Sequence, residues 1–358
     1  MALDLQVNRS ELTETRMVES VTPEMGPGQA LLHVDRFALT SNNVTYAVLG
    51  DAMGYWDLFP GDGAWGRVPA WGFADVIASD HDGLPEGSRV FGLVPMSTHL
   101  VITVAKATPR GLVDAAPHRD SGHGAYNWYQ RADQRPADED HHALLRPLFI
   151  LSFLLSQHLD DHEYFGAATV LLSSASSKAA LGTAARLSQL GGVTTAGLTS
   201  EERTAFVEGL ELYDHVVTYG DVAALPPDPT VYLDFSADDP TREAVHRHYG
   251  NHLVRSLLVG GTHQQRPWAG EDVAPVARHE LFFAPTELAA RTREWGREEL
   301  EERIETSWNR FAARSTGWFA ITHDRGSDAV RRTWTNLVNG VLDPATGHIA
   351  MLTPGPPA

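Results

Sequence analysis

The chain has 358 residues, contains no cysteine and carries a net charge of −18, from 46 acidic and 28 basic residues. Without cysteine, disulfides, a cysteine nucleophile and cysteine-ligated zinc are excluded. The acidic balance argues against a nucleic-acid partner or an anionic membrane surface. The length and the 42% of hydrophobic residues predict a globular protein with two domains that binds a small molecule.

The opening residues have no basic segment followed by an apolar core, so we expect no signal peptide. No apolar run approaches the roughly 20 residues that a membrane-spanning helix needs. We therefore expect a cytoplasmic protein.

Short strands at close spacing are predicted over residues 1 to about 115, a pattern typical of a small β-barrel. A glycine-rich loop, residues 50–66, carries bulky aromatic residues that either fix it to the core or line a pocket. These aromatic residues are Tyr55, Trp56, Phe59 and Trp65. The expected strands are residues 28–35 with an extension to 39, 69–78, 89–94 and 99–104.

The stretch from about residue 118 to 143 is rich in His, Asp, Arg and Gln, with Tyr126, Trp128 and Tyr129 in its middle. We expect it to form a partly exposed arm. Residues 144–159 are strongly apolar and predict a buried helix that begins after Pro147.

A strand, a polar turn, a helix and a second strand follow one another from residue 169 to residue 198. The helix over 179–190 is alanine-rich and stops at Gly191-Gly192. This order is a βαβ unit, the start of a doubly wound parallel sheet. Later elements continue the alternation: strands at 215–218, 230–235 and 253–259, helices at 201–210, 242–249, 286–313 and 329–341, and a last strand at 348–352.

The turn of this unit has an unusual composition. A helix N-terminus attracts a pyrophosphate, and its usual fingerprint there is G-x-G-x-x-G. Here Ser174, Ser176 and Ser177 stand near the glycine positions, and Lys178 adds a charge. Serine hydroxyls can bond phosphate oxygens, although a serine backbone approaches them less closely than a glycine backbone. A serine-capped helix that binds nothing is the alternative.

Several stretches follow one another along the chain: GQALLHVDRFALTSNN, VPAWGFADVIAS, LPEGSRVFGLVP, LLRPLFILSFLL…ATVLLSSASSKAALG and HVVTYGDV. Their order resembles the zinc-free quinone-reductase and enoyl-reductase branch of the medium-chain dehydrogenase/reductase superfamily. With SSASSK in place of the glycine motif and FFAP later, the chain looks like an offshoot of that branch.

The resemblance implies an α/β protein with a GroES-like β-barrel domain and a Rossmann domain, and an active site in the cleft between them. The barrel would take residues 1–143, the Rossmann domain 144–285, and a segment over 286–358 would return to the barrel. It also implies NADPH as hydride donor to a carbonyl or a conjugated alkene, and a possible homodimer. Without a metal, hydrogen bonds or positioning must activate the substrate.

The resemblance further implies a set of cofactor-binding residues. The turn would face the pyrophosphate, and the end of the second strand would lie beside the adenosine ribose. Two hydroxyls and an arginine at that strand end suit a 2′-phosphate, whereas NAD would require a carboxylate. Three later residues would pass near the nicotinamide, and Phe283 would close over it. The set is Ser174, Ala175, Ser176, Ser177, Lys178, Thr199, Ser200, Arg203, Tyr219, Gly260, Gly261, Thr262 and Phe283.

For catalysis the resemblance favours Tyr46 as proton donor, because the enoyl-reductase branch uses a tyrosine from this region; Tyr55 is the second choice. Asn42 or Asn43 would orient the substrate or the nicotinamide amide. The alternative for Tyr46 is a core tyrosine with a satisfied hydroxyl. The aromatic residues of the loop and the arm suggest a flat or apolar small-molecule substrate.

Two further alternatives stay open. His158 and His162 are four residues apart, so on a helix they could share a face and bind a metal, although a solvated helix end is the simpler interpretation. The chain could also be a binding protein that keeps the fold but has lost or altered its nucleotide site, because serines replace the glycines of the turn.

Overall fold

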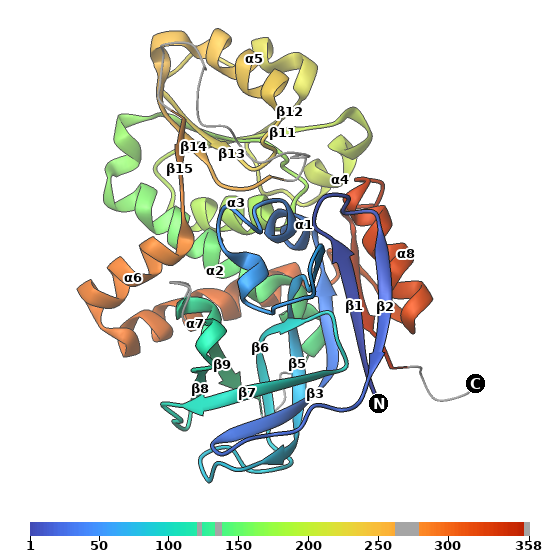
Figure 1. The fold of residues 1–358 in the computed structure, drawn as a ribbon. Helices are drawn as coiled ribbons and strands as arrows, with labels where there is room; N and C mark the ends of the chain where they lie inside the picture. The colour runs from blue at the N-terminus through green and yellow to red at the C-terminus, as the bar shows by residue number, and fades with distance from the viewer. Residues whose placement is uncertain (120–123, 133–137, 262–278, 354–358) are drawn as a thin grey trace. The chain divides into compact units, whose positions relative to one another are not determined.

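The computed structural model describes residues 1–119, 124–132, 138–261 and 279–353 (Figure 1). The chain divides into two compact units: unit 1, Met1–Leu144 with Ala320–Ala358, and unit 2, Leu145–Phe319. In the described ranges, no helix combines the length and the apolar character needed to cross a membrane.

Unit 1 contains a closed ring of six antiparallel strands, which confirms the predicted barrel. The ring closes where β7 returns to β3, through pairs from Gln29↔Thr103 to His33↔His99. Buried and half-buried residues alternate along β7, as expected for a strand with one face toward a core. In ring order the strands are β3 (Gln29–Leu39), β5 (Pro69–Ser79), β6 (Arg89–Pro95), β9 (Trp128–Arg131), β8 (Gly111–Asp114) and β7 (His99–Ala105).

Two strands from the end of the chain extend this sheet. The predicted last strand is confirmed: β17 (Thr346–Met351) pairs antiparallel with the end of β3, and β16 (Ala320–Arg325) lies parallel beside β17. The sequence did not indicate β16, because most of its residues are polar and most are exposed. Unit 1 also holds a small sheet and two helices: β1 (Ala2–Asn8), β2 (Thr15–Ser20), β4 (Trp65–Gly66), α1 (Ser41–Val48) and α8 (Ser327–Val338).

The glycine-rich loop is fixed to the barrel core by its aromatic residues. Trp56 is 2% exposed and Phe59 is 1% exposed. A Cβ atom at Gly50 or Gly66 would lie 2.0 or 2.4 Å from the Trp56 side chain, so the loop needs glycine at both positions to enclose this ring. For these two aromatic residues, the structure supports fixing to the core as the main role.

In the stretch expected to form a partly exposed arm, residues 118–143, the described residues 128–131 form the barrel strand β9 and residues 139–143 begin the next helix. Arg119 is 1% exposed and donates to the carbonyl oxygens of Leu58 and Tyr126, at 3.2 and 2.8 Å. Tyr129, in β9, is fully buried and donates to the Leu93 carbonyl oxygen. Hydrogen bonds from buried polar groups thus hold this stretch against the barrel.

The helix predicted to begin after Pro147 begins earlier. Helix α2 spans Glu139–Asp161, and Pro147 lies inside it. The acidic first turn supplies the physical reason: Glu139 accepts two bonds from Arg89 at 2.7 Å, and Asp140 accepts one from Arg36 at 2.8 Å. These bonds hold the first turn in place ahead of the proline.

Unit 2 contains a six-stranded sheet in the order β12-β11-β10-β13-β14-β15, with every pair parallel. This is the strand order of dinucleotide-binding sheets, and the direction of winding reverses between β10 and β13. Every residue of β10 and β13 is buried, as expected for central parallel strands. The strands are β10 (Thr169–Leu172), β11 (Thr194–Thr199), β12 (His215–Thr218), β13 (Thr230–Asp234), β14 (Leu253–Leu258) and β15 (His279–Leu281).

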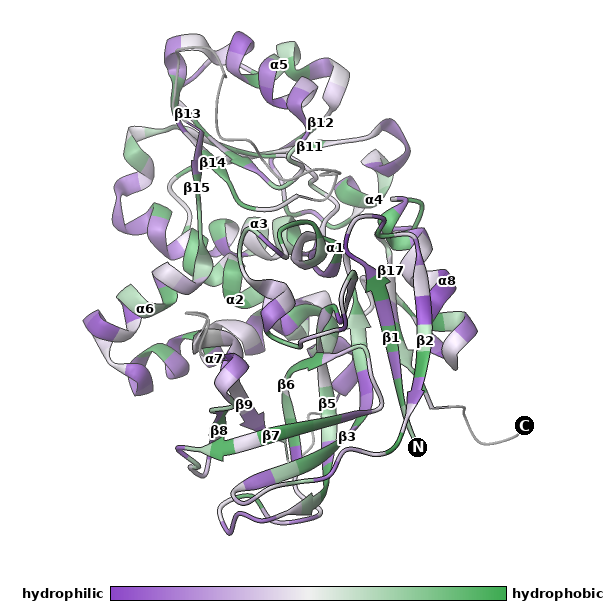
Figure 2. Ribbon diagram, in the orientation of Figure 1, coloured by the Kyte–Doolittle hydropathy of each residue, from purple (hydrophilic) through white to green (hydrophobic). Residues whose placement is uncertain are grey.

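Helices complete unit 2. Figure 2 shows that hydrophobic and hydrophilic residues are mixed along helix α5, whereas the barrel strand β6 of unit 1 is mostly hydrophobic. The long helix predicted for 286–313 is two helices, because Gly296 takes a φ of +80° and ends the first. Helices α2 and α3 pack closely: a Cβ atom at Gly182 would lie 2.7 Å from the Ser152 hydroxyl. The helices are α3 (Lys178–Leu190), α4 (Thr204–Gly209), α5 (Asp239–Tyr249), α6 (Ala284–Trp295) and α7 (Arg297–Ser315).

Candidate functional site

The first candidate site is the turn between β10 and α3, residues 173–177, which we call the serine turn. It leaves the carboxyl end of β10, next to the reversal in strand order, where open α/β sheets bind their ligands. Ser177 is the N-cap of α3, and its hydroxyl accepts a bond from the Ala180 N–H at 3.4 Å. The cap and the helix dipole make this end attractive for an anion.

Ser174 takes the backbone conformation that glycine normally supplies in such a turn. Its φ is +49°, in the left-handed region. A side chain in this region costs roughly 1–2 kcal/mol, because the Cβ atom crowds the backbone. The serine turn therefore has the path of a glycine turn although it lacks the glycine, which is a feature that the sequence alone did not predict.

Two tyrosines hold the serine turn from the neighbouring strand connections. The Ser174 N–H donates to the Tyr219 hydroxyl at 3.1 Å, and the Tyr213 hydroxyl donates to the Ala175 carbonyl oxygen at 3.0 Å. Burial raises the pKa of Tyr219 to about 12, so its hydroxyl is neutral at ordinary pH. Ala175 is fully buried against Gly197, so its side chain supports the turn from below rather than lining a site.

The start of α3 carries one positive side chain. The Lys178 ammonium group lies 4.8 Å from the centre of the Phe319 ring. Ser176 is 9% exposed, and its N–H has no acceptor among the residues that the structure describes. The turn thus presents a backbone donor, hydroxyls and a cation within a few residues, which is the donor set that a phosphate group requires.

The end of β11 contains the residues predicted to lie beside a ribose. Thr199 is 1% exposed inside the strand, whereas Ser200 is half-buried and begins a short 3₁₀ helix, Glu201–Arg203. The Arg203 N–H donates to the Ser200 carbonyl oxygen at 3.0 Å, which fixes the backbone between them. Ser200 and Arg203 therefore stand at the strand end, while Thr199 belongs to the core.

Asp234, at the end of β13, joins the serine turn to its neighbour across the reversal. It is fully buried, and one of its carboxylate oxygens accepts bonds from the Ser173 hydroxyl, the Ser236 hydroxyl and the Ala237 N–H at 2.8–2.9 Å. The Asp234 carbonyl oxygen also accepts from the Gly260 N–H at 3.2 Å. The sequence analysis did not predict Asp234 as a site residue. Its position as the acidic last residue of an apolar strand could have indicated it.

A buried histidine lies beside this carboxylate. His279 Nε2 is 3.6 Å from the second oxygen of Asp234, and its Nδ1 bonds the Ser256 hydroxyl at 2.8 Å. Burial lowers the pKa of His279 to about 4, so the ring is neutral near pH 7.

The predicted nicotinamide residues are only partly described. Gly260 is held to β13, as above, and Gly261 follows it and is buried. Phe283 is the N-cap residue of α6. Thr262 lies outside the described residues.

In unit 1, Tyr46, Tyr55 and Tyr126 form what we call the tyrosine cluster. The ring centres of Tyr46 and Tyr55 are 4.8 Å apart, and each lies 5.9 Å from that of Tyr126. The Tyr126 hydroxyl is hydrogen-bonded to both others, and Trp71 Nε1 donates to the Tyr46 hydroxyl at 3.2 Å. Burial raises the pKa of all three hydroxyls, so each keeps its proton.

The two asparagines beside Tyr46 have different partners. Asn42 is hydrogen-bonded to the Tyr46 hydroxyl. Asn43 is 2% exposed; its side-chain oxygen accepts from the Thr40 N–H at 2.7 Å and its amide donates to the Pro69 carbonyl oxygen at 2.8 Å. Asn43 therefore caps α1 and ties it to β5, and its role toward a substrate stays a prediction.

Tyr126 was missed as a site residue, although its stretch was noted for its aromatic residues. Its position depends on Arg119, whose guanidinium bonds the Tyr126 carbonyl oxygen and lies 4.7 Å above the Phe59 ring. This arrangement is non-local, so no pattern in the sequence predicts it.

The histidine pair lies at the end of α2. The rings of His158 and His162 are 4.6 Å apart, and His158 Nδ1 is 3.6 Å from Glu287. His162 Nδ1 is occupied by the His158 carbonyl oxygen at 2.8 Å. Across the described ranges, no group of three His, Asp or Glu side chains is placed to hold a metal ion.

Three solved structures share this fold along nearly the whole chain. CurA from Vibrio vulnificus, in complex with NADPH, has a TM-score of 0.63 at 12% identity, covering 96% of this chain and 95% of that chain. Mycobacterial Rv1454c complexed with NADPH has 0.60 at 14%, covering 98% and 100%. A mutant enoyl thioester reductase from Candida tropicalis has 0.60 at 12%, covering 98% and 99%.

At such identities the likeness shows the fold alone. The closed barrel and the six-stranded parallel sheet are those of the medium-chain dehydrogenase/reductase fold, as the resemblance implied. No curated protein matches the chain. The family described as "Protein of unknown function (DUF2855)" matches residues 37–343. Because this match spans most of the chain, the protein belongs to the DUF2855 family.

Proposed function

We propose that this protein is an NADPH-dependent, metal-free oxidoreductase that reduces a carbonyl or a conjugated alkene of an apolar or aromatic small molecule. One observation carries the proposal: the serine turn has a glycine-like conformation at Ser174, at the N-terminus of α3 and beside the reversal in strand order. Two structures of the same fold, named above, are NADPH complexes, which supports this choice of cofactor.

The residues of the serine turn fit a pyrophosphate. The Ser176 N–H lacks an acceptor in the described part of the chain, and the Ser176 and Ser177 hydroxyls and the Lys178 ammonium group add donors. In this proposal these groups hold the pyrophosphate, while Tyr219 keeps Ser174 in its left-handed conformation. When bound, NADPH would supply a hydride, the chemistry that no side chain can supply.

The preference for NADPH over NADH rests on the end of β11. Ser200 and Arg203 are half-buried there, and the turn also carries the exposed acids Glu201 and Glu202. In this proposal Arg203 faces the ribose, where an NAD-selective site would place a carboxylate. A guanidinium binds a phosphate through paired N–H groups. We therefore assign the ribose 2′-phosphate to Arg203, with Ser200 as a second donor.

The proton for the reduction is assigned to Tyr46. Its hydroxyl stays protonated because burial raises its pKa, and it is hydrogen-bonded to Asn42, Trp71 and Tyr126. Tyr46 is 5% exposed, and these partners fix the position of its hydroxyl. In this proposal a substrate oxygen would take the place of one partner and accept a proton or a hydrogen bond from Tyr46.

A titration with NADPH, followed by nicotinamide fluorescence, tests the cofactor assignment. We expect binding by the wild-type chain, and a loss of about tenfold in NADPH affinity in Arg203→Ala, with NADH affinity unchanged; tenfold corresponds to about 1.4 kcal/mol. Arg247→Ala, at an exposed position on α5, is the matched control. Equal losses for NADPH and NADH would remove the 2′-phosphate assignment, and no binding at millimolar NADPH would remove the function.

The catalytic assignment has its own variant. Tyr46→Phe should keep NADPH affinity and lose turnover by roughly 10²-fold, the usual contribution of a positioned proton donor. Tyr129→Phe is the control, because this hydroxyl is also buried in unit 1 but, among the described residues, bonds only the Leu93 carbonyl oxygen. Equal turnover in Tyr46→Phe and the wild-type chain would exclude Tyr46 as the donor.

A second candidate function is favoured by one observation. The Tyr219 hydroxyl already occupies the Ser174 N–H, a donor that a phosphate would otherwise use. A binding protein with an altered nucleotide site would have this arrangement. It would bind a small molecule without responding to NADPH in the titration above.

A further inference from the structure

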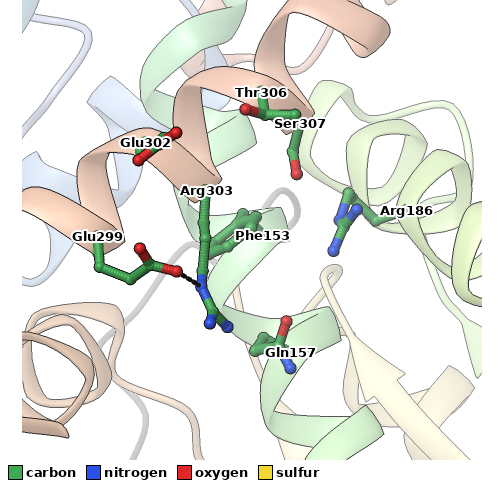
Figure 3. Close-up of a pocket in the computed structure, with 8 residues that line it drawn as sticks. All are labelled: Phe153, Gln157, Arg186, Glu299, Glu302, Arg303, Thr306 and Ser307. Carbon is green, nitrogen blue, oxygen red and sulfur yellow. Dashed lines mark hydrogen bonds and ion pairs between the residues drawn. The ribbon is translucent and has the colours of Figure 1, made fainter. Parts of the chain in front are cut away.

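Unit 2 contains a second polar site, away from the serine turn. A hollow of about 310 Å³ lies among α2, α3 and α7 (Figure 3). Arg186, which reaches it from α3, is nine residues beyond the N-cap Ser177, so the hollow and the serine turn lie along different parts of this helix. The hollow is lined by Phe153, Gln157, Arg186, Glu299, Glu302, Arg303, Thr306 and Ser307.

Arg186 is a buried cation that forms no ion pair with a carboxylate among the residues that the structure describes; Asp160 acts on it from a longer range, against the like charge of Arg310. It is 7% exposed, and its guanidinium lies 5.2 Å from the centre of the Phe153 ring. Among the described residues its single hydrogen bond runs from Nη1 to the Gln189 side-chain oxygen at 3.3 Å, and its Nε has no acceptor. A guanidinium has five N–H donors, and a buried charge is costly unless it is paired.

Another buried arginine of unit 2 shows what complete pairing looks like. Arg291, also 7% exposed, bonds Glu287 at 2.7 Å and Glu294 at 3.0 Å, and it forms an ion pair with Asp161. Burial lowers the pKa of Arg186, whereas the carboxylates around Arg291 raise its pKa above the ordinary value. Arg186 therefore lacks the directly bonded carboxylates that the equally buried Arg291 has.

The other lining groups define the ligand that could supply this anion. Ser307 is 8% exposed, and neither its hydroxyl nor that of Thr306 makes a hydrogen bond within the described residues. Arg303 is already paired with Glu299 at 2.7 Å, as Figure 3 shows. Glu302 adds a negative charge at the rim. A guanidinium without a direct ion pair, close to the acids Glu302 and Asp160, suits one negative charge and disfavours two.

We propose that this hollow binds a small organic monocarboxylate. Its carboxylate pairs with Arg186, whose planar fork matches the two oxygens, and the Ser307 and Thr306 hydroxyls bond its remaining polar atoms. Nothing in this assignment depends on the reductase function or on NADPH.

Calorimetric titration of the full chain with sodium lactate, without NADPH and at constant ionic strength set by sodium chloride, tests the proposal. We expect saturable binding by the wild-type chain and a loss of at least tenfold in affinity in Arg186→Gln, the effect of removing a charge-assisted pair. Arg247→Gln, at the exposed position on α5, is the control and should bind as the wild-type chain does. Acetate should bind more weakly than lactate, because it lacks the hydroxyl.

A second variant keeps the test valid if Arg186→Gln does not fold. Thr306→Leu changes an exposed residue of α7, so it should fold, and it should abolish binding by filling the hollow. Three results would overturn the proposal: heats with lactate no different from those with chloride, equal affinity in the wild-type chain and both variants, or tighter binding of inorganic phosphate than of lactate. The last result would assign the hollow to a dianion instead.

Discussion

Two buried arginines, one in each unit, lie over phenylalanine rings at nearly the same distance yet have opposite surroundings. Arg89 of β6 is 5.3 Å from the Phe73 ring centre, and Arg186 of α3 is 5.2 Å from that of Phe153. Arg89 bonds three carboxylates at 2.7 Å, whereas Arg186 makes one bond of 3.3 Å to a neutral amide.

The difference distinguishes an arginine that connects elements of the fold, Arg89, from one that we propose binds a ligand, Arg186. The carboxylates around Arg89 come from Asp35 of β3, Asp75 of β5 and Glu139 of α2, so a single side chain joins three elements to its own. Within the described ranges, Arg186 bonds Gln189 of its own helix and lies over the Phe153 ring of α2. Burial alone therefore does not identify an arginine that stabilises the fold. The number of carboxylates bonded to its guanidinium distinguishes such an arginine from a candidate binding residue.

The largest expected effect is a direct test of this contrast. Arg89→Met should lower the free energy of unfolding by about 3–5 kcal/mol, because three buried or half-buried carboxylates lose their partner. Arg186→Met should change it by less than about 1 kcal/mol, because an apolar side chain there removes an unpaired buried charge. Urea unfolding followed by circular dichroism measures both. Equal losses in the two variants would break the comparison.

The next effect concerns a group that unit 2 buries without charge. His279 has a folded pKa of about 4, below its ordinary value of about 6.5, so below pH 6.5 the unfolded chain takes up a proton that the folded chain refuses. The neutral His279 therefore adds to the free energy of unfolding above pH 6.5. This stabilisation, about 3 kcal/mol, is lost as the pH falls toward 4.

His279→Gln should remove that part of the slope when unfolding is measured in urea between pH 7 and pH 4. His323→Gln, at a 40% exposed side chain paired with Asp140 in unit 1, is the control. An unchanged slope in His279→Gln would show that this ring is not buried in its neutral form.

The smallest effect tests the backbone of the serine turn. Ser174→Gly should be more stable than Ser174→Ala by about 1 kcal/mol, because both variants lose the hydroxyl but only alanine keeps a Cβ atom at a φ of +49°. Thermal or urea unfolding of the two variants gives the difference. If alanine is as stable as glycine, the turn does not hold the left-handed conformation in solution.

The sequence predicted the elements whose patterns are local. The strict alternation over residues 99–104 predicted β7, and the alanine-rich run that stops at Gly191-Gly192 predicted α3. It missed β9, which has four residues and is fixed by pairing with β6 and β8 rather than by its own pattern. It also missed the break at Gly296, because charged helical residues continue on both sides of it.

The same limit applied to the candidate sites. Serines before a helix predicted the Ser177 cap, a local feature. The left-handed Ser174 depends on its support by Tyr219, which is 45 residues away, and Tyr126 depends on Arg119 and the barrel. The lack of a directly bonded carboxylate at Arg186 could not be predicted either, because the sequence does not show which acidic side chains lie near an arginine in the fold.

The closed ring of unit 1 also limits how two copies of this protein can meet. Because β7 returns to β3, the barrel offers no free strand edge on which another chain could continue the ladder. In the described part of the chain, five strands end their sheets and pair on one side only: β2, β4, β12, β15 and β16. Any assembly that extends a sheet from one subunit into the next must therefore begin at such a terminal strand, and an assembly built on the barrel must rely on side chains.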